Sequence, residues 1–355
     1  MKRIDTILLA TVIFLTLFGF FFVYDASSYV AFRDFSDKYH YVKDQFIWVI
    51  LGSIGLISFS YFDYRRLYNL SLPLLFIAIV LLVLVFVPGI GVYLLGAYRW
   101  VDFKIFVLQP AEFVKLVLAI YLSSWFANKE KGRFVAFLLL LSLVLFLILM
   151  QPDMGTAVVI LCEALLIYFL SGSNVLYFTV LVPIIAAIGM FIIKSSPYRA
   201  KRLEAFLNIN QSIEGSSYHV KQILIALGSG GITGVGLGNS LQKYAYLPET
   251  TTDSIFAIIA EELGFIGATV IIILFAVVAW RGFYIATRAK DNFGKLLAAG
   301  ITTFLATQTI INLGALTALF PLTGIPLPFI SYGGSALIID LCSIGILLNI
   351  SRDRA

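Results

Sequence analysis

Residues 246–267, YLPETTTDSIFAIIAEELGFIG, combine the start of an apolar helix with a high density of carboxylates. The acids are Glu249, Asp253, Glu261 and Glu262. The apolar run that begins here, near 254–280, is long enough to cross a lipid bilayer. The stretch therefore predicts a membrane helix whose first turns hold acidic groups. The chemistry available to these acidic groups depends on the side of the membrane on which they lie.

The composition of the whole chain agrees with a membrane protein. Of its 355 residues, 60% are hydrophobic and 13% are charged, and the mean hydropathy is +0.97. Soluble domains carry about 25% charged residues, and a chain this apolar could not cover its hydrophobic surface in water. The net charge of +5 is modest, and basic residues in membrane proteins set orientation. We therefore expect an integral membrane protein in contact with membrane lipid, with no nucleic-acid partner.

Apolar runs of sufficient length occur ten times along the chain. They lie near 6–24, 45–62, 71–88, 107–127, 134–150, 154–171, 174–193, 254–280, 296–317 and 335–350. The first run follows a basic N-terminus but lacks a small-residue cleavage site, so it suits a retained span better than a signal peptide. These runs predict an all-α polytopic membrane protein with about ten transmembrane helices, built as a single integral membrane domain over 1–355.

Lysine and arginine indicate the orientation. With ten spans both termini lie on one side, and the short segments of that side carry thirteen Lys and Arg against five on the other. Short cytoplasmic loops are enriched in basic residues, so both termini are expected in the cytoplasm. The long loop 194–253, between spans seven and eight, is then extracytoplasmic. The acids of 246–267 lie at the outer face.

The long loop contains two segments that could bind an anion. Arg199, Lys201 and Arg202 are spaced so that one helical face presents all three. This pattern is typical of a solvated, headgroup-facing helix, but arginine forks also suit a phosphate or diphosphate. Six glycines from Gly228 to Gly238 are not typical of a helix and could form a backbone nest for phosphate. No strand precedes them and no GK[ST] follows, which argues against a nucleotide loop.

Asp253 has two interpretations. Thr250 and Asp253 have the spacing of a capping box, which favours a structural role at the start of the helix. A carboxylate placed where water, sugar and lipid headgroups meet also suits a general base, provided that desolvation, a cation or an activated electrophile assists it. From the spacing alone, the cap is the stronger interpretation.

Charged residues inside the predicted spans are further candidates, because unpaired charges in lipid are costly. Glu112 and Lys115 are three residues apart and form either a structural pair or part of a site. Glu163 and Asp340 also fall within spans.

Two further features of the sequence could contribute to a site. Glu261 follows Asp253 by eight residues, so a continuous helix would present both on roughly one face. The segment 321–335, PLTGIPLPFISYGGS, has three prolines and three glycines. Such a helix-breaking backbone is tolerated at membrane depth only where protein or a cavity covers it. We expect it to be a re-entrant or outer loop that lines a site.

Several long motifs share one resemblance. They are RWVDFKIFVLQPAEFVKL (99–116), QPDMGTA (151–157), GSGGITGVGLGNSLQKYAYLPETTTDSIFAIIAEELGFIG (228–267) and NLGALTALFPLTGIPLPFISYGGSALI (312–338). In this order they resemble the SEDS family (shape, elongation, division and sporulation proteins) over nearly the whole chain. The ending IPLPFISYGGSAL resembles the RodA, or elongation, branch more than the division protein FtsW. One departure is Ser254, where the family often has Phe.

The resemblance implies a peptidoglycan glycosyltransferase that polymerises lipid II at the outer face of the bacterial cytoplasmic membrane. It implies that Asp253 matches the essential aspartate. The donor would be a glycan on undecaprenyl diphosphate, and a class B penicillin-binding protein would be the transpeptidase partner. A divalent cation, Mg²⁺ or Mn²⁺, is an alternative to basic side chains for offsetting the charge of the diphosphate. Supporting or substrate-binding roles are expected for Glu112, Lys115, Glu261, Arg99, Arg199, Lys201, Arg202, Asp153 and Ser331.

Two other functions fit the same residues. A transporter that flips lipid II would also have ten spans, intramembrane charges and a broken-helix loop, although no inverted repeat is evident. A scaffold that only recruits a wall synthase would tolerate Asp253→Asn. The resemblance, more than the residues, favours the enzyme.

Overall fold

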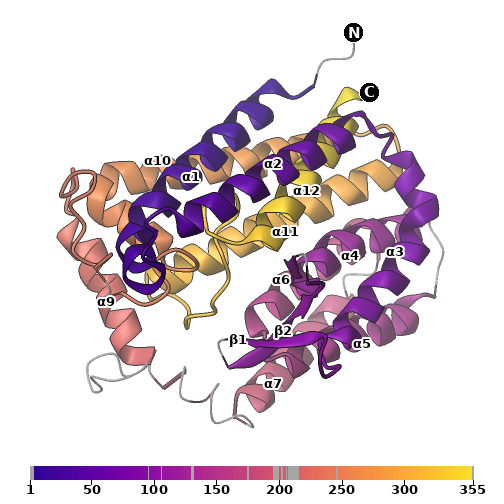
Figure 1. The fold of residues 1–355 in the computed structure, drawn as a ribbon. Helices are drawn as coiled ribbons and strands as arrows, with labels where there is room; N and C mark the ends of the chain where they lie inside the picture. Colours follow the sequence, from indigo (N-terminus) through magenta and orange to yellow (C-terminus); the bar gives the residue numbers. More distant parts are fainter. Residues whose placement is uncertain are drawn as a thin grey trace.

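Long helices dominate the computed structural model (Figure 1). It describes residues 4–94, 96–104, 106–128, 132–173, 176–194, 200, 203–204, 206, 216–244 and 247–353. The helices are α1 (Thr6–Phe35), α2 (His40–Tyr61), α3 (Arg65–Leu84), α4 (Pro110–Phe126), α5 (Phe134–Met150), α6 (Met154–Leu170), α7 (Leu176–Lys194), α9 (Ser216–Ser229), α10 (Ile255–Arg288), α11 (Asn292–Leu316) and α12 (Gly334–Arg352). Each predicted apolar run overlaps one of these helices, which confirms the all-α class.

Several of the helices can cross a bilayer. In the described part of the chain, six are long and apolar enough by length and composition: α1, α2, α3, α10, α11 and α12. The apolar helices α5 and α6 are shorter. The protein is therefore a multi-pass membrane protein, while the number of ten crossings stays a prediction.

A small antiparallel sheet between α3 and α4 was not predicted. Its strands β1 (Gly91–Leu94), β2 (Ala97–Asp102) and β3 (Val107–Leu108) pair in the order β1-β2-β3. The apolar runs predict a third span that ends near 88 and a fourth that begins near 107. In the structure, α3 ends at Leu84 and α4 begins at Pro110. Proline at the first position of α4 suits a helix start, and the Tyr, Trp and Val residues of 92–101 favour strands.

Two hydrophobic clusters hold the helices together. One is built mainly from α1, α10, α11 and α12, and the other from α3, α4, α5 and α6. Helix α4 contributes to both clusters and packs against α3, α6 and α11. Figure 1 shows α1, α2, α10, α11 and α12 side by side, with α3 to α7 forming the other side of the molecule.

The two termini lie at the same end of the bundle (Figure 1). Asp5 caps α1 by accepting from the Leu8 N–H at 3.0 Å, and its own N–H donates to Ser351 Oγ at 3.1 Å. Arg281 Nε of α10 donates to Asp5 Oδ2 at 3.1 Å. These bonds join the start of α1 to the end of α12. An even number of crossings places both of these helix ends on one side of the membrane.

Helix α10 has a break in its backbone. Gly264 has φ 68 and ψ −169, a conformation open to glycine but strained for other residues. At this break the glycine-rich segment 230–238 pairs with the helix through its backbone. The Phe265 N–H donates to the Gly231 carbonyl at 2.9 Å, and the Val235 N–H to the Glu261 carbonyl at 3.0 Å.

Candidate functional site

The N-terminal ends of four helices meet around the loop 321–333. At α10, the Tyr332 N–H donates to the Thr251 carbonyl at 2.8 Å. Gly155 at the start of α6 lies against Ile325, so closely that a Cβ there would overlap the isoleucine. The starts of α4 and α12 are joined by the Gln109 N–H, which donates to Ser335 Oγ at 3.0 Å. Helix N-termini carry partial positive charge, so this region favours an anion.

Asp253 is half-buried and lies just before α10. The N-cap of α10 is Ser254, without a side-chain cap hydrogen bond, and the first helical residue is Ile255. The capping box expected from Thr250 and Asp253 is therefore wrong for this helix start. The chain turns once more before the helix, and Thr250 Oγ1 donates to the Ala26 carbonyl of α1 at 3.4 Å.

The two carboxylate oxygens of Asp253 have different surroundings. Oδ1 lies 3.4 Å from Thr252 Oγ1 and 3.5 Å from Ser254 Oγ. Oδ2 lies beside Gly324, 3.7 Å from the position that a Cβ there would take. Gly324 has φ +72, which other residues rarely adopt. Because glycine has no side chain, Oδ2 faces the bare backbone of Gly324.

Asn312 of α11 fixes the backbone on both sides of this carboxylate. Its Nδ2 donates to the Asp253 carbonyl at 2.9 Å and to the Ile325 carbonyl at 2.8 Å. Asn312 is not among the site residues predicted from the sequence. An amide inside a predicted apolar span is the signal that could have found it, because buried polar groups need partners.

Ser331 fastens the loop to the segment before α10. Its hydroxyl donates to the Thr252 carbonyl and accepts from the Leu327 N–H at 2.8 Å. The predicted site residue therefore lies in the site, where its contacts position the loop backbone.

Glu112 and Lys115 form a buried ion pair on α4. The distance from Lys115 Nζ to Glu112 Oε2 is 2.7 Å, and each residue is 1% exposed. Lys115 also donates to Gln308 Oε1, and Gln308 Nε2 donates to the Pro326 carbonyl at 2.9 Å. The sequence left structural and functional roles open, and the structure connects the pair to the same loop that borders Asp253.

Two more acids lie within electrostatic range of Lys115. Glu163 of α6 and Asp340 of α12 are fully buried. Within the described residues, neither oxygen of either side chain has a hydrogen-bond partner. Together with Glu112, three buried carboxylates thus surround one lysine, an arrangement that is costly if all are ionised.

Arg99 and Asp153 meet at the start of α6. Arg99 of β2 donates from Nε to the Gln151 carbonyl at 3.1 Å and from Nη2 to the Pro152 carbonyl at 2.6 Å. Asp153 is the N-cap of α6 and accepts from the Thr156 N–H at 3.0 Å. Both predicted residues hold the turn that places α6 against the loop.

Glu261 lies apart from Asp253. Its carboxylate accepts from the hydroxyls of Ser240 and Ser229, the latter at 3.3 Å. The expected common face requires a helix that is continuous from Asp253, but α10 begins only at Ile255. Glu261 instead anchors the glycine-rich segment to α10.

Glu262 occupies the predicted glycine nest. It accepts from the Gly238 N–H at 2.9 Å and the Ser240 N–H at 3.2 Å, and pairs with Lys243 at 3.0 Å. The anion held by these amides is the chain's own carboxylate, which argues against the phosphate-nest interpretation.

Lys243 links this segment to α1. Its Nζ lies 2.9 Å from Asp25 Oδ1 as well as 3.0 Å from Glu262 Oε1. Burial alone would lower the pKa of Lys243, but hydrogen bonds and charges from Asp25 and Glu262 outweigh burial and raise that pKa. The ion triad holds α1, the glycine-rich segment and α10 together.

The remaining predicted cations, Arg199, Lys201 and Arg202, fall outside the described residues. Across the described ranges, no group of three or more His, Cys, Asp or Glu could hold a metal ion.

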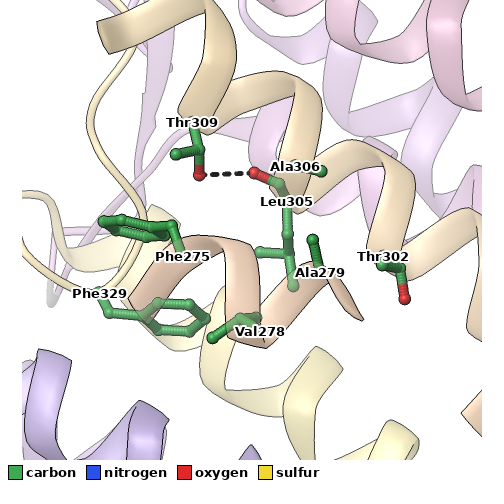
Figure 2. Close-up of a pocket in the computed structure, with 8 residues that line it drawn as sticks. All are labelled: Phe275, Val278, Ala279, Thr302, Leu305, Ala306, Thr309 and Phe329. Carbon is green, nitrogen blue, oxygen red and sulfur yellow. Dashed lines mark hydrogen bonds between the residues drawn. The ribbon is translucent and has the colours of Figure 1, made fainter. Parts of the chain in front are cut away.

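An apolar hollow lies between α10 and α11 (Figure 2). Its lining is Phe275, Val278, Ala279, Thr302, Leu305, Ala306, Thr309 and Phe329. The hydroxyls of Thr302 and Thr309 donate to carbonyls of their own helix at 2.7 and 2.8 Å. The hollow therefore presents apolar surface, because both hydroxyls are used within their own helix.

Comparisons with known proteins found similar sequences and similar structures. The family described as "Cell cycle protein", of FtsW, RodA and SpoVE, matches residues 5–355. A probable peptidoglycan glycosyltransferase FtsW of Trichlorobacter lovleyi is 40% identical over 98% of this chain and 93% of that protein. Stage V sporulation protein E of Bacillus subtilis is 39% identical over 98% of this chain and 97% of that protein.

Solved structures show the same fold. A chain from work described as "Structural coordination of polymerization and crosslinking by a peptidoglycan synthase complex" aligns with a TM-score of 0.81 at 26% identity, covering 99% of both chains. Rod shape determining protein RodA of Thermus thermophilus aligns with a TM-score of 0.74 at 27% identity, covering 99% of this chain and 98% of the other.

Proposed function

Because the chain belongs to the FtsW, RodA and SpoVE (SEDS) family, we propose that it is a peptidoglycan glycosyltransferase that polymerises lipid II. The reaction takes place at the outer face of the bacterial cytoplasmic membrane. The observation that carries this proposal is the position of Asp253: a half-buried carboxylate with one oxygen beside the bare backbone of Gly324, where four helix N-termini meet.

Asp253 serves as the general base in this proposal. Oδ2 accepts the proton of the acceptor GlcNAc 4-hydroxyl as its oxygen attacks the MurNAc anomeric carbon of the donor. The bond from that carbon to the undecaprenyl diphosphate breaks, and the diphosphate leaves with the electron pair. A single displacement inverts the anomeric configuration and needs no covalent enzyme intermediate.

The leaving diphosphate gains negative charge, which the surroundings must offset. The positive ends of α4, α6, α10 and α12 contribute. Among the candidate cations, Arg99 lies at the start of α6, where it is half-buried. Lys115 is less suited because its ammonium is buried and bonded to Glu112 and Gln308. Arg199, Lys201 and Arg202 are the further candidates, with Mg²⁺ or Mn²⁺ as the alternative.

A class B penicillin-binding protein is the proposed transpeptidase partner. The structurally similar chain from a peptidoglycan synthase complex supports this assignment. The assignment to the elongation branch stays a prediction, because the similar sequences described above carry FtsW and sporulation names and RodA shares 27% identity.

Polymerisation of labelled lipid II tests the proposal. The full-length chain is purified with its class B partner, and wild type is compared with Asp253→Ala and with Asp37→Ala. Asp37 is an exposed carboxylate that pairs with Lys43 at 2.6 Å, so its variant controls for loss of an outer-face charge. We expect glycan ladders from wild type and Asp37→Ala and none from Asp253→Ala.

Two results would contradict the proposal. Equal ladders from wild type and a folded Asp253→Ala would remove the general base and leave Asp253 with a structural role. No ladder from any variant with the partner bound would favour a lipid II flippase or a scaffold. A flippase would move labelled lipid II across vesicles and lose that movement when Glu112 or Lys115 is replaced.

A further inference from the structure

His219 of α9 reaches the start of α10. Its Nε2 lies 2.9 Å from Ser254 Oγ, and Ser254 Oγ lies 3.5 Å from Asp253 Oδ1. Ser254 is fully buried, whereas His219 and Asp253 are half-buried. The three side chains therefore form a line that ends at the carboxylate.

The hydroxyl of Ser254 has a single hydrogen to share between its two neighbours. If that hydrogen goes to His219, Asp253 Oδ1 loses a donor beside its negative charge. If His219 Nε2 carries a hydrogen and donates it to Ser254, the hydroxyl hydrogen goes to Oδ1. A hydrogen bond to an ionised carboxylate is stronger than one to a neutral ring nitrogen, so the second arrangement is favoured.

We propose that His219, acting through Ser254, is a positioning residue for the Asp253 carboxylate. The bond from Ser254 holds Oδ1 and so keeps Oδ2 toward Gly324, where the acceptor hydroxyl approaches. This inference rests on the proposed function, since it assigns a role in the same reaction.

The packing of α9 in the described structure includes buried apolar side chains other than His219. Helix α9 is held by apolar side chains in the main hydrophobic cluster, among them the fully buried Ile223 and Ala226. The imidazole lies near the other end of α9, where the helix meets the site. Removing it leaves the apolar contacts of α9 in place, which makes the role testable in a folded protein.

The test measures kcat and KM for lipid II polymerisation by the full-length chain with its class B partner. The variants are His219→Leu, His219→Gln, Ser254→Ala and the double variant His219→Leu/Ser254→Ala, with Ile225→Ala as control. Ile225 is an exposed residue of the same helix. Melting temperatures in detergent establish that each variant is folded.

We expect His219→Leu to lower kcat about ten- to a hundredfold, with KM changed by less than about twofold. The amide N–H of Gln can replace the imidazole N–H, so His219→Gln returns kcat to within about threefold of wild type. Ser254→Ala and the double variant match His219→Leu, because all three break one chain of bonds. Ile225→Ala has wild-type kinetics.

The role of His219 is contradicted, while the proposed function stands, if polymerisation requires Asp253 and His219→Leu is as active as wild type. It is also overturned if Gln fails to restore kcat in a folded protein, or if the losses from His219→Leu and Ser254→Ala multiply in the double variant. If wild type forms no polymer, or Asp253→Ala is fully active, the proposed function fails and the inference fails with it.

Discussion

At the scale of single residues, the amide of Asn312 joins the two backbone segments that flank the Asp253 carboxylate. Replacing it with Leu removes the donor to the half-buried carbonyl of Asp253 and the donor to the buried carbonyl of Ile325. We expect Asn312→Leu to cost about 1–3 kcal/mol for each carbonyl and to lower polymerisation strongly. Thermal unfolding in detergent and the ladder assay measure the two effects.

Thr317→Val is the matched control for that prediction. The hydroxyl of Thr317 is exposed and donates to the Leu313 carbonyl of its own helix at 3.0 Å, so its loss should change neither quantity. A stable, fully active Asn312→Leu protein would show that the loop and α10 hold the site without the amide.

The buried charges around Lys115 make a second prediction. Lys115→Met leaves the Glu112, Glu163 and Asp340 carboxylates without a cation, and removing one partner of a buried pair costs about 3–5 kcal/mol. Glu163→Gln removes a carboxylate whose oxygens make no hydrogen bond in the described structure, so we expect a change below about 1 kcal/mol. Equal melting temperatures for Lys115→Met and Glu163→Gln would contradict the prediction, because they would show that Lys115 does not stabilise the three carboxylates.

Asp253 became the catalytic candidate through the family resemblance, whereas the Glu112–Lys115 pair is a candidate because charges in apolar runs stand out and an i, i+3 spacing fixes a local contact. The sequence could not identify Gly324 beside Asp253 or His219 beside Ser254. Those contacts join segments far apart in the chain, and their approach depends on how the helices pack. The capping box failed for a local reason, since one more turn precedes α10.

At the scale of elements, the break in α10 depends on two glycines. Gly264 has a positive φ, and a Cβ at Gly234 would overlap the Glu262 carbonyl. Gly264→Ala and Gly234→Ala should each destabilise the protein by about 2 kcal/mol or more and expose the 230–245 segment to protease.

Gly228→Ala is the control for these variants. Gly228 is in α9, and a Cβ there would meet nothing within 4 Å. Alanine in a helix is favoured over glycine, so we expect unchanged or slightly higher stability. Equal protease resistance of all three variants would contradict the role of the backbone pairing.

Apolar length was enough to locate the long helices, because a bilayer requires long runs whatever their packing. It could not locate the sheet, since strands as short as Val107–Leu108 carry little pattern. Apolar length also did not predict α9 (Ser216–Ser229), a short helix within the predicted loop 194–253 that is apolar on only one face.

At the scale of the whole molecule, the sidedness inferred from Lys and Arg remains open to direct test. In a background with Cys162 and Cys342 replaced by Ala, Leu241→Cys lies on the expected outer face and Thr287→Cys on the inner face; both positions are exposed. We expect a membrane-impermeant maleimide to label Leu241→Cys in intact spheroplasts and Thr287→Cys only after permeabilisation. The reverse pattern would place the site in the cytoplasm.

The break at Gly264 also bears on how the chain enters the membrane during synthesis. From Phe265 to Trp280 there is no charged side chain, and this stretch spans about 24 Å as a helix, most of a bilayer of about 30 Å. This stretch is apolar enough to favour partitioning from the translocon into lipid. Glu261 and Glu262 emerge after the segment that carries Ser240 and Lys243, so these partners of the two acids are already synthesised when the acids leave the ribosome.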